Sequence, residues 1–186
     1  MPCLITAGVG ITCAALRRVG GVNKRAYVFN INQLVSTGIG GYTIDADGYV
    51  NSLSFTTYFG LYEYISRKQA HSGGATAQIQ SPGGNKYFQH DVILKLFPDD
   101  PTEDTAMETL LTSSVGIILE DNNQEFLLYG IQNGLDQTEG AQNTGQEQAS
   151  DIAYSVTFSG AEPDLPKRVL LTDYVTTKNY LDNLVQ

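Results

Sequence analysis

The chain has 186 residues, enough for one large domain, and its 41% hydrophobic residues with 11 Tyr and 7 Phe indicate a folded core rather than disorder. The formal net charge of -9 excludes a clustered basic footprint for nucleic acid over most of the chain. Cys3 and Cys13 are too few for a disulfide framework or a metal site. The apolar N-terminal run precedes its arginines and is too short to span a membrane, so we expect a soluble protein from a reducing compartment.

The first half of the chain predicts short β-strands separated by turns. Residues 27–31 (YVFNI) form a strand, and Asp47-Gly48 is a hairpin turn signal between short alternating runs. Alternation over 58–69 (YFGLYEYISRKQ) predicts a half-buried strand. The following 71–85, with two Gly-Gly pairs and a proline, are predicted to be turn and loop.

A further strand is predicted over 86–97, with alternate side chains on one face. That face carries Phe88, His90, Val92, Leu94 and Leu96. One helix, at about 102–112, is predicted from Thr102 as an N-cap, acidic residues in the first turn and an apolar i, i+3, i+4 stripe. The stripe consists of Met107, Leu110 and Leu111.

After the helix, 115–129 predict a β-hairpin with a polar turn. Residues 133–151 contain no aromatic residue, no base and one large aliphatic residue, which predicts a long polar loop. The next strand points Ile152, Tyr154, Val156 and Phe158 inward. The fold class is therefore mainly β (α+β): a β-sandwich or barrel of antiparallel strands with one flanking helix.

Charge is unevenly distributed along the chain. The first acid is Asp45, so the preceding segment carries only bases, whereas Asp91 to Asp164 contain 15 acids and one base, Lys95. The distribution is consistent with a solvated acidic face. It also favours docking of the basic segment of one copy on an acidic surface of the next. The bases concerned are Arg17, Arg18, Lys24 and Arg25.

No motif in the chain predicts a catalytic, metal or cofactor site. Gly8 and Gly10 begin a dinucleotide fingerprint, but its third glycine is replaced by Cys13. The sequence from Asp45 to Tyr49 starts like a calcium loop but lacks the later oxygen ligands, so a hairpin turn is favoured. Enzymatic activity and a cofactor are therefore not expected.

The second half of the chain resembles the tail-tube-like virion structural proteins of tailed phages, especially the kind found in phages of Bacteroidetes hosts. The resemblance spans roughly residues 60–166, where a strand and a helix precede an "EDN" strand end, a "G…NGL" segment, a polar loop and a "YxxTFxGxE" strand followed by proline. The usual "TSGTAFGD" of the loop is "NTGQEQASD" here. The matching residues are Glu120, Asp121, Asn122, Gly130, Asn133, Gly134, Leu135, Tyr154, Thr157, Phe158, Gly160, Glu162 and Pro163.

The resemblance implies a single tube-like β domain over 1–166, with 1–40 as a candidate assembly segment and 167–186 as a C-terminal arm. It also implies rings, typically hexameric, that stack into a virion tail tube assembled in the host cytoplasm, contact other tail or neck proteins and pass DNA without binding it. Besides the four bases above, the polar loop supplies the expected subunit contacts, which are Asn133, Gly134, Asp136, Thr138, Glu139, Gln142, Asn143, Thr144 and Gln146. The acidic lumen candidates are Asp45, Asp47, Asp99 and Asp100.

Two other functions remain open at this point. One is a head–tail connector, neck or capsid-decorating protein within the same virion. The other is a β-sandwich carbohydrate-binding module that uses the eleven tyrosines. Tyrosines gathered on one exposed face would favour the binding module, whereas tyrosines divided between core and contacts would favour the tube.

Overall fold

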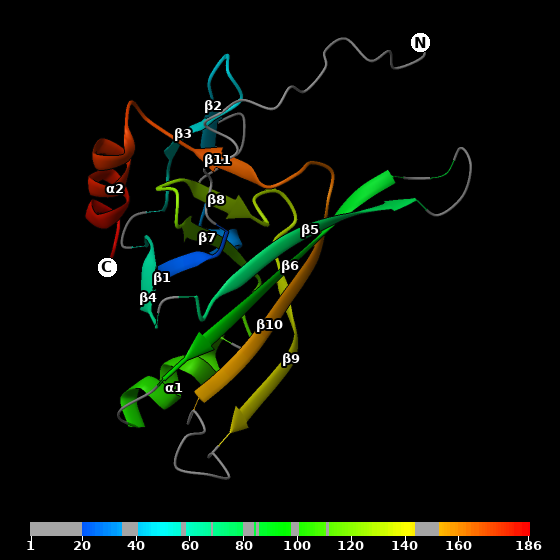
Figure 1. Cartoon of the computed structure of the whole chain (residues 1–186), viewed down its shortest axis with the longest axis vertical. Helices are drawn as coiled ribbons and strands as arrows, with labels where there is room; N and C mark the ends of the chain where they lie inside the picture. Colours follow the sequence, from blue (N-terminus) through cyan, green and yellow to red (C-terminus); the bar gives the residue numbers. More distant parts are fainter. Residues whose placement is uncertain are drawn as a thin grey trace.

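The computed structural model describes residues 20–34, 41–56, 59–67, 69–79, 84, 86–97, 101–110, 112–143 and 153–186, with only the backbone described at 101–104, 107, 142 and 143. These residues form two sheets and two α-helices (Figure 1). The mainly β, sandwich-like α+β fold class predicted from the sequence is confirmed.

The larger sheet has seven strands in the order β2-β3-β11-β8-β7-β1-β4. Its strands are β1 (Val22–Asn30), β2 (Tyr42–Ile44), β3 (Val50–Leu53), β4 (Tyr62–Ile65), β7 (Val115–Asp121), β8 (Phe126–Tyr129) and β11 (Lys167–Val169). A 3-10 turn, η2 (Ile31–Gln33), follows β1. The hairpins predicted around Asp47-Gly48 and over 115–129 are confirmed as β2–β3 and β7–β8.

The smaller sheet has four strands in the order β5-β6-β10-β9, and every neighbouring pair is antiparallel. Its strands are β5 (Ser72–Ile79), β6 (Lys86–Leu96), β9 (Asp136–Asn143) and β10 (Ala153–Glu162). The shared face predicted for β6 is confirmed and is the inward one, with His90, Val92, Leu94 and Leu96 buried and Phe88 half-buried. Val156 and Phe158 of β10 are also buried as predicted, whereas Ile152 lies outside the described residues.

The main core lies between the two sheets. Ala26 and Val28 of β1 and Ile117 and Leu119 of β7 face the small sheet. Alternate residues of the same strands, including Tyr27, Phe29 and Ile118, belong to a second buried cluster on the opposite face of the large sheet, together with Leu181 of α2. The strands β1 and β7 are therefore buried on both faces.

Two predicted loops are strands, because pairing with a neighbour outweighs local composition. The Gly-rich segment predicted as loop forms β5, paired with β6 from Ser72↔Ile93 to Ile79↔Lys86. The first part of the polar loop predicted over 133–151 forms β9, paired with β10. The core side of β9 carries Gln137 and Gly140, so no apolar alternation marked it as a strand.

Both helices correct the sequence-based boundaries. The single predicted helix is α1 (Pro101–Leu110), so Thr102 lies inside it rather than capping it. The C-terminal arm predicted over 167–186 is instead part of the domain. Strand β11 lies between β8 and β3, and α2 (Tyr174–Asn183) packs on the large sheet with Leu181 fully buried.

The tip of the β5–β6 hairpin and helix α1 lie at opposite ends of the small sheet (Figure 1). Strand β6 extends beyond β10 at the tip, because its pairing with β10 begins at Phe88 whereas its pairing with β5 begins at Lys86. No helix among the described residues has both the length and the apolar character needed to cross a membrane.

Candidate assembly surface

Several of the sequence-motif residues, Asn133, Gly134, Leu135, Gly160 and Glu162, meet at one junction between the two sheets. The buried Glu162 carboxylate, at the end of β10, accepts the backbone N–H groups of Asn133 at 2.8 Å and Gln132 at 3.2 Å. The Asn133 side chain donates in return to the Ala161 carbonyl at 2.6 Å. These bonds satisfy a buried carboxylate with backbone donors, which holds the β8–β9 connection against β10.

Glycines allow the backbone to approach closely at this junction. A Cβ on Gly160 would lie 2.4 Å from the Gly134 carbonyl oxygen, and Gly134 itself has φ of +82°. Next to it, buried Leu135 exchanges backbone hydrogen bonds with Val115 of β7, at 2.7 and 2.9 Å. The small sheet is thereby hydrogen-bonded directly to the large one.

We predict that Gly160→Ala lowers the free energy of unfolding by about 1–3 kcal/mol, because the new methyl group collides with the backbone of Gly134. Gly74→Ala in β5 is the matched control, since a Cβ there meets nothing within 4 Å. Chemical denaturation of both variants measures the difference. Equal stability of the two variants would contradict a close-packed junction.

The imidazole of His90 closes the junction from the β6 side. Its Nε2 lies 2.9 Å from the Asp164 carbonyl oxygen, and its Nδ1 accepts from Gly130 N–H at 3.4 Å, which requires the neutral tautomer with the proton on Nε2. Burial lowers the pKa of His90, although the Asp164 carbonyl and the charges of Glu162 and Asp91 oppose that shift. Burial likewise lowers the pKa of His71, opposed by the Lys24 and Tyr64 carbonyls.

We predict that the protein loses stability as the pH falls from about 7 to about 5. The folded histidines have pKa values below the ordinary value of about 6.5, so the unfolded chain binds more protons across this window. Urea denaturation at several pH values measures the slope. His90→Gln should reduce it, and a stability that is constant or rises on acidification would contradict the neutral assignment.

The outer face of the small sheet is largely polar, although it also carries Tyr87 and Ile93, the latter 39% exposed. Cross-strand register places Thr76 of β5, Asp91 of β6, Thr157 of β10 and Glu139 of β9 on the side away from the core. Gln89 donates to Ser159 at 2.5 Å, and Ser159 donates to Asp91. The charged residues that the register puts on this face are Asp91, Asp136, Glu139 and Lys95, three acids and one base.

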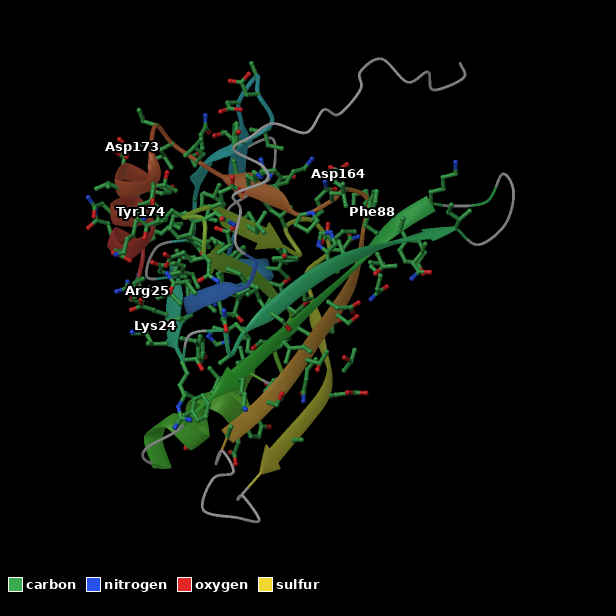
Figure 2. All side chains as sticks on the ribbon, viewed as in Figure 1. Lys24, Arg25, Phe88, Asp164, Asp173 and Tyr174 are labelled. Atoms are coloured by element: carbon green, nitrogen blue, oxygen red, sulfur yellow. The ribbon has the colours of Figure 1, made fainter. Side chains whose placement is uncertain are left out.

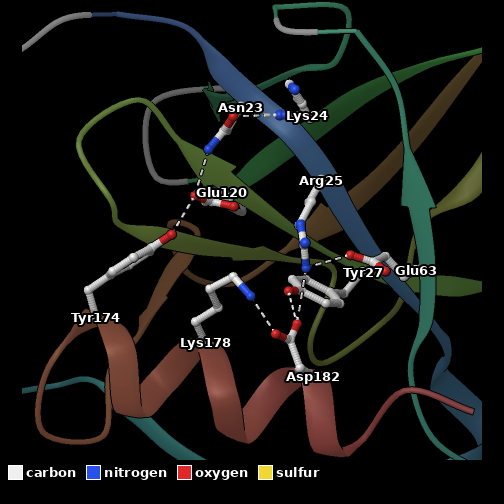
Figure 3. Close-up of polar contacts among 9 residues, drawn as sticks. All are labelled: Asn23, Lys24, Arg25, Tyr27, Glu63, Glu120, Tyr174, Lys178 and Asp182. Atoms are coloured by element: carbon white, nitrogen blue, oxygen red, sulfur yellow. Dashed lines mark hydrogen bonds and ion pairs between the residues drawn. The ribbon is translucent and has the colours of Figure 1, made fainter.

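A polar cluster holds α2 against the face of the large sheet that is turned away from the small sheet (Figure 3). Asp182 accepts from the buried Tyr27 hydroxyl at 2.7 Å and pairs with Arg25 and Lys178. Burial pushes the pKa of Asp182 up, but the hydrogen bonds from Lys178 and Tyr27 and the charge of Arg25 hold it below its usual value. Arg25 also pairs with Glu63 at 2.8 Å, so β1, β4 and α2 meet at one charge cluster.

Glu120 is the second centre of this cluster. It is 2% exposed and accepts from Asn23 Nδ2 at 2.6 Å and from the Tyr174 hydroxyl at 2.9 Å. Burial and the bond to Glu120 raise the pKa of Tyr174 to about 12, so its hydroxyl remains a donor. The Tyr174 ring stacks on Phe126 at 5.6 Å. These contacts hold the first turn of α2 against the large sheet.

We predict that Tyr27→Phe lowers the free energy of unfolding by about 1–2 kcal/mol, because it removes a donor to the charged Asp182 without changing the core volume. Tyr62→Phe on the exposed side of β4 is the control and should change stability by less than about 0.5 kcal/mol. Calorimetric unfolding at pH 7 compares them. An unchanged Tyr27→Phe variant would show that α2 does not depend on this bond.

The basic residues predicted at subunit contacts divide into three groups. Arg17 and Arg18 lie outside the described residues. Lys24 is exposed, whereas Arg25 is engaged within its own chain by Glu63 and Asp182. Figure 2 shows Lys24 and Arg25 on the side of the molecule near α2 and β4, away from the polar sheet.

The predicted loop contacts are likewise divided. Asn133 and Gly134, predicted at subunit contacts, take part in the junction within their own chain, although Asn133 remains exposed. The backbone of β9 carries Asp136, Thr138, Glu139, Gln142 and Asn143, of which the first three have described, partly or fully exposed side chains. Thr144 and Gln146 lie outside the described residues.

Of the predicted lumen acids, Asp45 and Asp47 lie at the β2–β3 turn of the large sheet rather than on the polar sheet. Asp45 accepts the backbone N–H groups of Asp47 at 3.0 Å and Tyr49 at 2.9 Å, so it shapes the β2–β3 turn of the large sheet. Asp99 and Asp100 lie outside the described residues. The acids on the polar face, Asp91, Asp136 and Glu139, were missed as a set, because only the strand register brings them together.

Within the described ranges, no group of three or more His, Cys, Asp or Glu side chains could hold a metal ion. Comparison of the chain with protein-family models, with curated proteins and with solved structures found no match. The fold and the surfaces above are therefore the basis for a functional proposal.

Proposed function

We propose that this protein is a virion structural protein, a subunit that forms a ring of a phage tail tube and so contributes to a DNA conduit. The observation that carries the proposal is the four-stranded antiparallel sheet, which has a polar outer face and, within the described part of the chain, no strand beyond β5 or β9. Unpaired edges are templates for pairing with another chain. The sequence resemblance points to the same assembly.

The strand directions favour a closed ring. Four alternating strands leave β5 and β9 antiparallel to each other, so β9 of one copy can pair with β5 of the next without breaking the alternation. The contact is heterologous, joining two different edges, and such contacts close into a ring when the rotation between copies closes. Every copy would then contribute four strands to one continuous barrel, and no edge would remain.

Barrel dimensions set a lower limit on the number of copies. Strands about 4.8 Å apart and tilted by about 40° give a barrel about 48 Å across for six copies, and about 38 Å remain after side chains of about 5 Å on each wall. Three copies would leave only about 14 Å. A duplex about 20 Å wide therefore requires more than three copies, and six are ample.

The polar face has suitable chemistry for the inner wall. Its Ser, Thr and Gln side chains and its excess of two acids over bases offer no cluster of cations to phosphate. DNA binds basic surfaces largely by releasing counterions, and a weakly acidic wall lacks that driving force. DNA would pass along such a wall without being retained.

The tyrosines do not favour the carbohydrate-binding alternative. Tyr27 and Tyr129 are buried, and Tyr62 is the only tyrosine of the described residues that is classed as exposed. The other seven described tyrosines are half-buried and lie on both sheets and on α2. A sugar-binding platform requires several aromatic faces together on one open surface. A connector, neck or decorating role would use the same edges without the conduit.

Lysine at the sheet edges tests the proposal. Thr76→Lys on β5 and Ala141→Lys on β9 change exposed positions, and edge lysines oppose pairing between sheets. We expect the wild-type protein to form rings with an open channel by negative-stain microscopy and mass photometry. Each variant should reduce the ring population by about tenfold or more, equivalent to about 1.4 kcal/mol.

Val175→Lys on α2 is the matched control, since it makes the same charge change at a 62% exposed position on the other side of the large sheet. It should assemble like the wild type, and all variants should unfold at similar temperatures. A wild-type protein that stays monomeric at high concentration would refute the ring. Edge variants that assemble normally would refute the edge-to-edge contact, and a channel narrower than a duplex would refute the conduit.

A further inference from the structure

A cleft of about 260 Å³ lies between the end of β1, strand β4 and helix α1. Phe29, Tyr62, Tyr64 and Leu110 form its apolar wall, and Ala106 and Thr109 line it from the helix. Its size is just below the range of about 300–1,000 Å³ typical of small-molecule sites. The cleft is therefore suited to a few side chains of a polypeptide rather than to a cofactor.

The surfaces around the cleft are unpartnered within the described chain. Leu110 is the only buried side chain among those described on α1, whereas Ala106 and Thr109 are exposed beside the cleft. On the opposite wall, Tyr62 is 39% exposed, and Ile65 of the same edge strand is 61% exposed. Large apolar side chains exposed together on an edge strand such as β4 are typical of a surface that binds another polypeptide.

Charge indicates which segment of polypeptide would bind in the cleft. In sequence, helix α1 carries Glu103, Asp104 and Glu108 and no base, and the described side chain of Glu108 is exposed. Residues 1–19 contain no acid, and their apolar side chains are followed by Arg17 and Arg18. The two segments are complementary in both apolar character and charge.

We propose that residues 1–19 of a second copy of this chain dock in the cleft, with apolar side chains against Tyr62 and Leu110 and with Arg17 and Arg18 against the acids of α1. The inference extends the proposed ring, because it names a second contact between copies. The described chain begins beside Asn122, which binds the Gly20 carbonyl at 2.9 Å, whereas the cleft adjoins Val28 to Asn30. About eight residues of β1, roughly 26 Å, separate Gly20 from the cleft. A chain's own N-terminal segment would have to run back along β1 to reach the cleft, whereas the segment of a neighbouring copy would not.

Site-directed cross-linking tests this contact. A Cys3→Ala background leaves Cys13 as the sole cysteine, and Ala106→Cys then places one thiol in the cleft wall. A short bis-maleimide should join Cys13 of one copy to position 106 of another and give dimers and larger multimers on a denaturing gel. Val175→Cys in the same background is the matched control, exposed but remote from the cleft, and should give at least fivefold less product.

Salt and charge removal give a second readout. Raising the salt from about 50 mM to about 500 mM, or replacing Arg17 and Arg18 with Ser, should lower the cross-linking yield severalfold, because both weaken attraction to the acidic helix. Intact mass spectrometry separates links between chains from links within one chain. A yield equal to that of the control, or links only within a chain, would overturn the proposal.

The outcomes also distinguish this contact from the ring itself. Multimers linked through the cleft in a preparation without rings would support the docking and refute the proposed tube. Rings seen by microscopy without cleft cross-links would support the tube and refute the docking. Thr109→Cys provides a second cleft position, so that one poorly placed thiol does not decide the result.

Discussion

The burial of β1 and β7 on both faces is the constraint on which the rest of the fold depends. Ala26 and Val28 face one side of the sheet, whereas Tyr27 and Phe29 face the other, and all four are buried. A strand pair with two apolar faces needs a cover on each side. The small sheet supplies one cover and α2, with its Leu181, supplies the other. Neither cover can be removed without exposing a full face of the central pair.

The two covers are attached by different chemistry. Helix α2 is held mainly by side chains, through Asp182, Glu120 and the Tyr180 hydroxyl, which bonds both backbone groups of Leu53. The small sheet is held at the junction mainly by backbone groups, through the Val115–Leu135 bridge and the N–H groups that Glu162 accepts. This attachment does not use the outer backbone edges of β5 and β9, although positions such as Gly73 and Gln137 face the core. The two outer edges therefore remain available to a neighbour.

Sequence patterns predicted the strands whose pattern was periodic or continuous and missed those that depend on neighbours. Strand β6 was predicted because Val92, Leu94 and Leu96 alternate, and the β7–β8 hairpin because its apolar runs flank a polar turn. Strand β5 was missed because its glycines resemble a loop, although a Cβ on Gly73 would lie 2.8 Å from Leu119 and Tyr129. Glycine there serves the approach of the two sheets, a requirement visible only in three dimensions.

Helix α2 was missed for a different reason. Its inward positions are Tyr174, Thr177 and Leu181, and a buried threonine interrupts the apolar stripe. One signal was present, since Asp173 is an N-cap that accepts from Thr176 N–H at 2.7 Å. The polar face proposed as the functional surface was harder to predict from the sequence than helix α2. Asp91 is far in sequence from Asp136 and Glu139, and only the register of three strands, with its shift in the β9–β10 pair, places the three acids on one face.

Charge imposes a final condition on any assembly of this chain. Each copy carries a formal charge of -9, so copies brought together in a ring repel one another unless opposite charges meet at their contacts. The fold already uses Arg25 and Lys178 to neutralise Asp182, Lys167 to pair with Asp164, and Arg168 to pair with Glu125. The chain has 11 bases against 20 acids, and two of those bases, Arg17 and Arg18, are adjacent in an N-terminal segment whose sequence contains no acid. Strand β5 carries no charged residue, so pairing it with β9, which carries Asp136 and Glu139, would bring no like charges together along the two strands. A basic segment would supply the attraction that an acidic subunit otherwise lacks.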